Sequence, residues 1–288
     1  DVEAMAAAQR RHLQILDDRN IEYQLISPRP YAMGHWGTPK AVTHWTSVTN
    51  DAIYQVCTMH PDRFGGIAQL PQHTSMDTAN CLDELELCVR EYGFVGAIVN
   101  PDPGGERQTP GLDQPYWYPL YEKAQALNAT LLIHGSFGKD PRTTDPYFTF
   151  LAEETLATLL LERSDTFDRF PELRIVVVHC GGAPSRFLTG SVSAEPLPNG
   201  MLPKNLFFDT CTYDRDCLSA FFRQRGVEHA CFGSEAPGSG TAVINPETGK
   251  PSDDLIPVLD SLPMLDDTAK RFIFHDNPKR VFSLIKAV

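Results

Sequence analysis

The chain has 288 residues, of which 37 are acidic and 25 basic, so its formal net charge is −12 at pH 7. With 42% hydrophobic and 22% charged residues its composition is that of a globular protein, which excludes a disordered, collagen-like or coiled-coil chain. An acidic chain without long runs of Lys and Arg is a poor partner for nucleic acid or an anionic membrane, so we expect a small-molecule partner.

Short β-rich runs alternate with longer runs of helical period, as expected of βα units around a parallel sheet. Seven strands are predicted, at Ile21–Ser27, Phe64–Leu70, Phe94–Asn100, Thr130–Gly135, Arg174–Cys180, Asn205–Thr210 and Ala230–Glu235. Helices are predicted at Val2–Asp18, Ala41–Met59, Thr78–Tyr92, Tyr116–Leu127, Leu151–Phe170, Asp214–Arg225 and Asp266–Leu284. Near-continuous Val, Ile and Leu in the strands indicates burial on both faces. This pattern favours an α/β fold, a TIM-like (β/α)8 barrel forming one domain over residues 1–288, since such barrels take about 250 residues.

Polar side chains follow several of these strands, at the edge where a TIM barrel carries its active site. Arg29 follows the first predicted strand between two prolines, and a guanidinium on such a rigid loop suits bidentate recognition of a carboxylate. An exposed surface arginine explains the same residue equally well. Asn100 ends the third predicted strand, where a capping or turn role is the alternative.

Two histidines end successive apolar strands. His134 closes the run Thr-Leu-Leu-Ile-His, and His179 closes Ile-Val-Val-Val-His. Neutral imidazole is a good zinc ligand, and a strand fixes the direction in which it points. A single strand-end histidine is often only structural, but two in succession favour a site.

Glu235 ends the last predicted strand among the small residues Gly233, Ser234 and Ala236. Small neighbours leave room for a ligand, and a carboxylate there can bind a metal or act as a general base. The alternative is a residue that begins a helix and interacts with its dipole.

The chain resembles the metal-dependent amidohydrolase superfamily, in the branch of aminocarboxymuconate-semialdehyde decarboxylase. The segments that carry the resemblance are Gly66–Gln72, Tyr118–His134, Phe167–Gly182 and Phe274–Leu284. Decarboxylases of this branch typically have Asp after the last strand, where this chain has Glu235. The Glu, with Gln24–Pro30 and the loop that follows Glu235, is most similar to the 4-oxalomesaconate hydratases of that branch.

The resemblance implies a hydratase of an oxo-polycarboxylate, acting in aromatic degradation, with a divalent metal that we expect to be zinc. It implies that His134 binds the metal, that His179 transfers a proton or polarises the substrate, and that Glu235 is the base that activates water. It further implies that Arg29 and Asn100 hold substrate carboxylates.

Two departures from the family pattern matter. Cys180 stands where the family has glycine. In the family, a His-x-His segment in the first strand supplies two metal ligands, and this chain contains no such segment. We therefore expect an open or distorted barrel that lacks the first strand, belongs to a longer chain, and shows His134 and Glu235 without metal.

Three alternatives remain open at this stage. The same barrel fits a decarboxylase or a carbon–carbon hydrolase of the branch, or an inactive metal-free barrel that binds a ligand or partner. Homo-oligomers are common among such barrels, although no segment identifies an interface.

The seven cysteines are odd in number and form no C-x-x-C pair, which favours a reducing, cytoplasmic location. No apolar stretch reaches the roughly 20 residues of a membrane helix, and no signal peptide is recognisable.

Overall fold

The computed structural model describes residues 2–139, 142, 146–183 and 202–285. Within them, seven parallel strands form one sheet whose strand order is the sequence order. The strands are β1 Gln24–Ile26, β2 Phe64–Ala68, β3 Gly96–Val99, β4 Thr130–Ile133, β5 Arg174–Val177, β6 Leu206–Asp209 and β7 Ala230–Cys231. Each lies inside a predicted strand, so the predicted strand set is confirmed.

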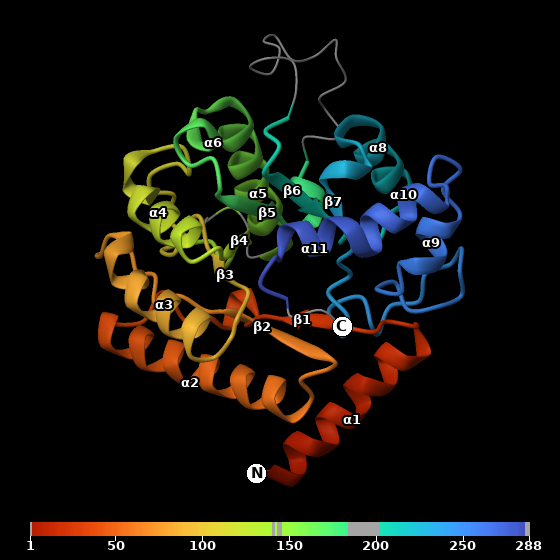
Figure 1. The fold of residues 1–288 in the computed structure, drawn as a ribbon, viewed down its shortest axis with the longest axis horizontal. Coiled ribbons are helices and arrows are strands. Elements are labelled where there is room, and N and C mark those ends of the chain that lie inside the picture. The colour runs from red at the N-terminus through yellow and green to blue at the C-terminus, as the bar shows by residue number, and fades with distance from the viewer. Residues whose placement is uncertain (1, 140–141, 143–145, 184–201, 286–288) are drawn as a thin grey trace.

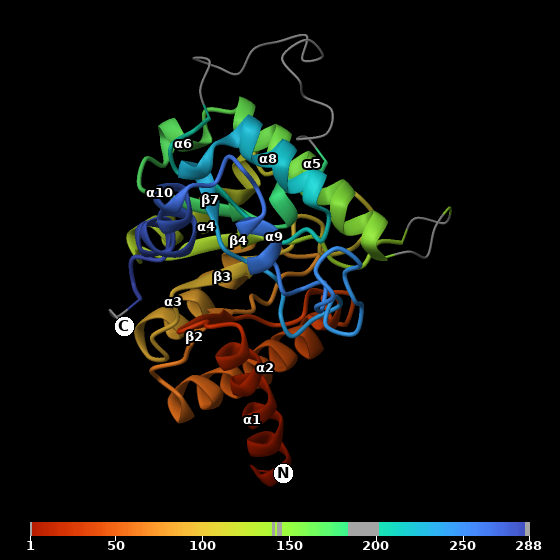
Figure 2. The same cartoon turned by 90° about the vertical axis from the view of Figure 1, so that its right-hand side faces the viewer.

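Helices surround these strands (Figure 1). The α-helices are α1 Val2–Asp18, α2 Pro39–Met59, α3 Leu82–Arg90, α4 Tyr118–Ala126, α5 Pro146–Arg163, α6 Thr166–Arg169, α8 Arg215–Arg225, α9 Ile256–Asp260, α10 Asp267–Arg271 and α11 Asn277–Val281. The shorter turns are η1 Pro30–Ala32, η2 Thr78–Cys81, η3 Pro115–Trp117, η4 His179–Gly181, η6 Val227–His229 and the π-helical η7 Phe272–Asp276. The N-terminal part of α1 projects from the rest of the molecule (Figure 2). Among the described residues, no helix is both long enough and apolar enough to cross a bilayer.

Helix ends follow local chemistry. The Thr38 hydroxyl accepts a hydrogen bond from the Ala41 amide, and Pro39 occupies the first turn of α2, where its missing N–H costs nothing. Asp214 caps α8 by accepting from the Cys217 amide at 2.7 Å. These capping residues explain where α2 and α8 begin.

The sheet curls into a barrel that stays open between its two edge strands. No pairing joins β1 to β7 within the described ranges. Two polar contacts bridge part of the opening. The Gln24 side-chain amide donates to the Ala236 carbonyl at 2.6 Å, and Arg19 forms a buried ion pair with Asp253, with Nη2 2.8 Å from Oδ1. The predicted open α/β barrel is confirmed.

Alternate strand residues pack on opposite faces of the sheet. Leu131 and Ile133 belong to the large cluster that also contains residues of α3, α4 and α8. Ile98, Val176 and Phe207 belong to a second cluster, which fills the inner face. Burial on both faces explains the near-continuous apolar strands.

The amino ends of the strands are covered by the C-terminal segment. Thr130 Oγ1 and Arg174 Nε, at the starts of β4 and β5, both donate to the Val281 carbonyl, at 2.5 and 2.8 Å. Phe282 joins the inner cluster beside it. Because this end is filled, the carboxyl ends of the strands are the edge available for a site.

Candidate active site

Chemically active side chains lie at the carboxyl ends of four neighbouring strands. His134 follows β4 and His179 follows β5. Cys211 follows β6 and Glu235 follows β7. Because these strands are parallel and adjacent, their ends meet at one edge. Two overlapping groups result, each with its ligand atoms within 4.8 Å of one another: His134, Glu154 and His179, and His179, Cys211 and Glu235.

Left-handed backbone marks two of these strand ends. His179 and Cys180 have φ of 51° and 57°, and Glu235 has φ of 59°. Non-glycine residues in this conformation cost about 1–3 kcal/mol each and persist where surrounding structure imposes them, often at active sites. At Gly182, with φ of 78°, a β carbon would lie 2.6 Å from the Thr155 nitrogen, so glycine is required. The packing therefore fixes the directions of His179 and Glu235.

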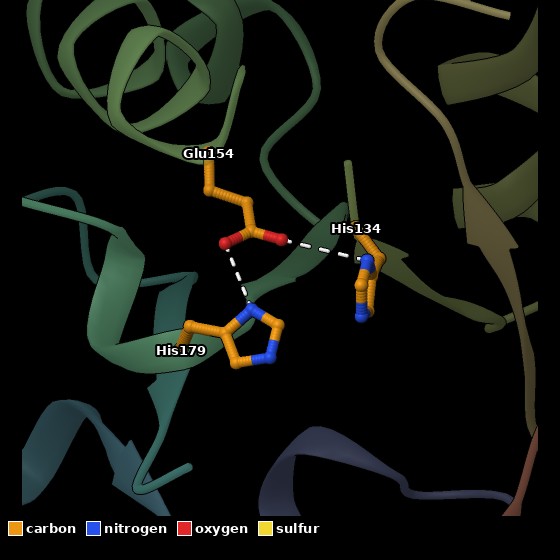
Figure 3. A group of neighbouring side chains, drawn as sticks. All are labelled: His134, Glu154 and His179. Atoms are coloured by element: carbon orange, nitrogen blue, oxygen red, sulfur yellow. Dashed lines mark hydrogen bonds and ion pairs between the residues drawn. The ribbon is translucent and has the colours of Figure 1, made fainter. Parts of the chain in front are cut away.

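Glu154 on α5 holds both histidines (Figure 3). Its side chain is fully buried, with Oε2 2.8 Å from Nδ1 of His179 and Oε1 3.5 Å from Nδ1 of His134. Oε1 also accepts a hydrogen bond from the Gly135 amide at 3.1 Å. The other ring nitrogen of each histidine faces away from Glu154 (Figure 3).

The two histidines differ in charge. Burial, reinforced by His179, lowers the pKa of His134 to about 3, so this imidazole is neutral. Burial also acts to lower the pKa of His179, but the charge of Glu154 and hydrogen bonds with Cys211 and Glu154 raise it well above its ordinary value. Burial raises the pKa of Glu154, and His179 opposes that shift. The site therefore combines a neutral His134 with a charged His179–Glu154 pair.

Glu235 is exposed, and two hydroxyl groups orient its carboxylate. Its Oε2 accepts hydrogen bonds from Tyr213 Oη at 3.1 Å and from Ser239 Oγ at 3.0 Å. A β carbon at Gly238 would lie 2.1 Å from the Glu235 carbonyl, so glycine is needed for the chain to turn here. No helix begins in residues 232–255, so Glu235 does not cap one. Both donors act on the same oxygen, Oε2.

Cys211 brings a buried thiol to the same edge. It hydrogen-bonds with His179, and burial raises its pKa to about 11, so it is not a thiolate nucleophile at neutral pH. Burial also raises the pKa of Cys180 well above its ordinary value, which makes that thiol equally unreactive. Asp209 ties both residues together, because its Oδ1 accepts from the Cys211 amide at 3.0 Å and the Cys180 amide at 3.4 Å.

The residues present fit a divalent cation. His134 Nδ1 lies 2.5 Å from the Gly135 carbonyl, and donation to that oxygen leaves the Nε2 lone pair for a metal. His179 directs Nδ1 to Glu154 in the same way. A histidine whose second nitrogen is held by a carbonyl or carboxylate is the usual form of a metal ligand. The donor chemistry of this edge thus suits zinc and similar ions.

Arg29 lies on the loop after β1, which contacts the loop after β4. Its side chain is exposed, with Nη1 donating to Tyr31 Oη at 3.0 Å. The loop that carries it contacts the loop after β4, because Ser136 Oγ donates to the Pro30 carbonyl at 2.8 Å. The structure therefore brings the Arg29 loop beside the loop of His134, and binding of a carboxylate by Arg29 stays a prediction.

Asn100 is buried and already engaged by the protein. Its Oδ1 accepts from the Asp102 amide at 3.0 Å, and its Nδ2 lies 3.4 Å from Nδ1 of His35. Gln72 bonds both the amide and the carbonyl of Asn100, each at 2.9 Å. These contacts order the loop after β3, which also holds Arg107, whose Nε donates to Glu153 at 3.1 Å. A substrate contact by Asn100 likewise stays a prediction.

The sequence predictions do not include Glu154, Cys211 or Tyr213 as site residues. Glu154 lies in helix α5, and a charged residue on the buried face of a helix was the available signal. Cys211 follows a strand, as the predicted histidines do. Tyr213 reaches Glu235 only through packing of two loops distant in sequence.

A sequence profile of the family described as Amidohydrolase matches residues 6–284. The chain belongs to the amidohydrolase family. The 2-keto-4-carboxy-3-hexenedioate hydratase of Sphingobium sp. (strain NBRC 103272 / SYK-6) is 33% identical over 294 residues, which cover 100% of this chain and 86% of that protein. The family predicted from the sequence is confirmed.

Solved structures agree with this assignment. The 4-oxalomesaconate hydratase of Rhodopseudomonas palustris is 30% identical, with a TM-score of 0.85 over 98% of this chain and 82% of that chain. A dihydroxybenzoic acid decarboxylase from Polaromonas sp. JS666, with bound manganese, is 22% identical, with a TM-score of 0.75 over 97% of this chain and 87% of that one. The second likeness shows the fold.

Proposed function

We propose that this protein is a hydratase that adds water to the conjugated double bond of 4-oxalomesaconate or a closely related oxo-polycarboxylate in the degradation of aromatic compounds. The observation that carries the proposal is the placement of Glu235 and His179, whose ligand atoms lie within 4.8 Å of each other. The two hydratases matched across nearly the whole chain support the same reaction.

Glu235 and His179 take complementary roles in this addition. Glu235 removes a proton from water as the oxygen attacks one carbon of the double bond. The electron pair of that bond moves toward the oxo group, and His179 stabilises the resulting enolate and delivers a proton to the neighbouring carbon. A proton returned from Glu235 to His179 restores both groups. The raised pKa of His179 keeps it protonated for this role.

His134 would hold a divalent cation, for which we propose zinc. When bound, such a cation polarises an oxo group or lowers the pKa of bound water toward about 7. The chain itself keeps His134 neutral and fixes its tautomer through the Gly135 carbonyl, so the nitrogen lone pair is ready without loss of a proton.

The substrate is an anion and the protein carries a formal charge of −12, so local positive charge must attract it. We assign Arg29 to a substrate carboxylate, because its loop contacts the loop of His134 through Ser136. We assign Asn100 to the same end of the substrate, where it also holds the loop that carries Arg107. An arginine fork matches a carboxylate in geometry as well as charge.

The loss of the conjugated absorbance of 4-oxalomesaconate tests the reaction directly. Glu235→Gln keeps the size of the side chain and removes the base, so we expect kcat to fall about 100- to 10,000-fold. Glu247→Gln, an exposed carboxylate on the loop after β7, is the matched control and should keep full activity. Full turnover by Glu235→Gln would exclude Glu235 as the base.

Two assays separate the alternatives. A decarboxylase or carbon–carbon hydrolase would release carbon dioxide or a cleaved fragment from an aromatic acid or from aminocarboxymuconate semialdehyde, and would leave 4-oxalomesaconate unchanged. An inactive metal-free barrel would purify without metal and without activity on either compound. Stoichiometric zinc in the purified protein would remove this last alternative.

None of the seven cysteines, all of which lie in the described part of the chain, forms a disulfide, which supports a location in the reducing cytoplasm. We further propose a homo-oligomer, as is common for barrels of this kind. Size-exclusion chromatography with light scattering measures this state.

A further inference from the structure

Helix α2 lies on the outside of the molecule and has two faces that carry apolar side chains (Figure 1). The inner face contains the buried residues Val42, Thr46, Asn50 and Ile53. On the outer side, 47% of Trp45, 45% of Val48 and 44% of Met59 is exposed. The solvent side of a surface helix normally carries polar and charged residues. The outer face of α2 therefore does not have the composition of a face that meets only water.

The outer residues of α2 have the spacing of a helix–helix contact. From Ala41 onward they recur at alternating steps of four and three residues until Met59. We refer to them as the α2 seam, which consists of the exposed residues Ala41, Trp45, Val48, Ala52, Gln55 and Met59. Such steps keep side chains in one line along a helix that packs against another helix. At 1.5 Å per residue the seam is about 27 Å long.

The α2 seam contains no charged side chain. Lys40 and Asp51 are the charged residues of the 21-residue helix, although 22% of the whole chain is charged. Asp51 is directed toward the end of α3, because its Oδ1 accepts a hydrogen bond from Tyr92 Oη at 2.5 Å. Depletion of charge marks the centre of a protein interface. In a chain with a net charge of −12, a face without acidic groups is also one where two copies repel each other little.

We propose that the α2 seam is the contact between two copies of this chain, which pack their α2 helices antiparallel about a twofold axis. The steps of the seam are the same in both directions, so the surface can pair with itself, as a twofold interface requires. Each position then faces its counterpart from the other end: Ala41 opposite the partner's Met59, Trp45 opposite the partner's Gln55, and Val48 opposite the partner's Ala52. Every pair sets a larger side chain against a smaller one, which lets the two faces interdigitate.

The ends of the helix favour the antiparallel direction. Lys40 lies in the first turn of α2, at the positive end of its own helix dipole. In an antiparallel pair this ammonium group lies beside the carboxyl end of the partner's helix, where unpaired carbonyl groups carry negative partial charge. A parallel pair would instead place the two Lys40 side chains together and set Trp45 against the partner's Trp45.

Trp45 is the anchor of the seam. Its Nε1 donates to the Ala32 carbonyl at 2.7 Å, and a β carbon at Gly34 would lie 3.4 Å from its Cδ1. The polar atom of the indole is therefore satisfied and the ring is held in place before the copies meet, which reduces the cost of association. Buried aromatic anchors of this kind carry most of the binding energy of an interface. At the other end, Met59 Sδ accepts from Gln9 Nε2 of α1 at 3.7 Å.

The size of the seam indicates a reversible dimer. One helix face of this length buries less than the about 800 Å² per partner of a standard interface. We therefore expect a Kd of about 1–100 μM. This inference rests on the homo-oligomer proposed above and not on the reaction that the protein catalyses.

Sedimentation of the purified protein over a concentration series tests the contact. Val48→Glu places like charges on both sides of the twofold axis, so we expect dimerisation to weaken at least about 100-fold, and Ala52→Lys should act in the same way. In an equal mixture of these two variants, the introduced carboxylate of one chain faces the introduced ammonium group of the other. We expect the mixture to recover a Kd within about tenfold of the wild-type value.

Ser47→Glu is the matched control, because it adds the same charge at an exposed position of α2 outside the seam. Its dimerisation should match that of the wild type. Circular dichroism of each variant shows whether it folds, and if Val48→Glu does not, Ala52→Lys and Gln55→Lys test the same contact. A monomeric wild type would overturn the contact, as would equal dissociation of the Val48→Glu and Ser47→Glu variants. A mixture that stays dissociated would overturn the antiparallel pairing.

The proposals fail in different ways. An oligomer that Val48→Glu leaves intact would refute the α2 seam and keep the homo-oligomer. A dimer that dissociates as expected in a protein without turnover of 4-oxalomesaconate would refute the hydratase and keep the seam. Turnover by a wild type that stays monomeric would keep the hydratase and refute both the seam and the homo-oligomer.

Discussion

Two buried ion pairs show how one kind of interaction serves two regions of the molecule. At the active edge, Glu154 pairs with His179 at 2.8 Å. At the opening of the barrel, Asp253 pairs with Arg19 at 2.8 Å. Both carboxylates are fully buried, so burial alone does not separate a site from a structural clamp.

The difference lies in the cation. Histidine can lose its proton, whereas arginine stays charged in proteins. The carboxylate of Asp253 is also fully satisfied, because Thr241 Oγ1 bonds to Oδ2 and Arg19 bonds to both Oδ1 and the backbone carbonyl. A titratable partner lets the Glu154–His179 pair change its charge, and a permanent partner lets Asp253 hold the loop after β7 against the end of α1.

The largest expected effect comes from the active edge. Glu154→Gln removes the charge that orients His179, so we expect kcat to fall about 100- to 10,000-fold, as for loss of an acid–base group. The free energy of unfolding should change by only about 1 kcal/mol, because His179 can discharge and the glutamine oxygen still accepts from Gly135. Steady-state kinetics and urea unfolding of the same preparation measure both quantities. A loss of stability in proportion to activity would show that Glu154 is only structural.

A substitution at the opening of the barrel should lower stability and leave activity unchanged, which is the reverse of the effect expected at Glu154. Arg19→Met leaves Asp253 buried without its cation, and we expect the free energy of unfolding to fall by about 3–5 kcal/mol. Turnover at a temperature where the variant is folded should stay close to that of the wild type. Urea unfolding measures the change in stability.

Arg63→Met is the matched control, because Arg63 pairs with Asp17 of α1 at the same 2.8 Å but with side chains 24% and 57% exposed. An exposed pair contributes about 0–1 kcal/mol. Equal losses in the two variants would mean that burial of the Arg19 pair adds nothing.

The fold could be predicted from the sequence because each strand is an apolar run bounded by turn residues. The same logic located His134, His179 and Glu235, since a side chain that ends a buried strand must point to one edge. Helix ends were less predictable. The run Leu151–Phe170 is two helices, α5 and α6, because the Ser164 hydroxyl contacts the Thr166 amide at 3.4 Å and competes with the helical pattern.

The rest of the site depends on packing that periodicity does not encode. Tyr213 and Ser239 meet on one oxygen of Glu235 only because the loops after β6 and β7 fold over each other. Likewise, Glu154 lies on helix α5 and contacts two histidines that follow the strands β4 and β5. Such convergence follows from tertiary structure, so the sequence indicates strand-end residues and omits the groups that orient them.

A third buried pair, Glu162 with Arg225, sharpens the comparison because it is poorly satisfied. Arg225 Nε and Nη2 are buried without a hydrogen-bond partner in the described part of the chain. Burial raises the pKa of Glu162 from 4.5 to about 7, although Arg225 opposes the shift. Like the Asp253–Arg19 pair, the Glu162–Arg225 pair contains an arginine. Unlike that pair, it leaves buried polar atoms without hydrogen bonds in the described residues.

This pair should also make the stability of the protein depend on pH. Because the pKa of Glu162 is higher in the folded protein, its contribution to the free energy of unfolding is fully present below pH 4.5 and is lost as the pH rises through about 7. At about 1.4 kcal/mol per unit of pKa, the loss is about 3–4 kcal/mol. Glu162→Gln should match the wild type in acid and exceed its stability by that amount above pH 7. Urea unfolding across this range measures the difference, and a difference that is independent of pH would show that Arg225 satisfies Glu162 as fully as Arg19 satisfies Asp253.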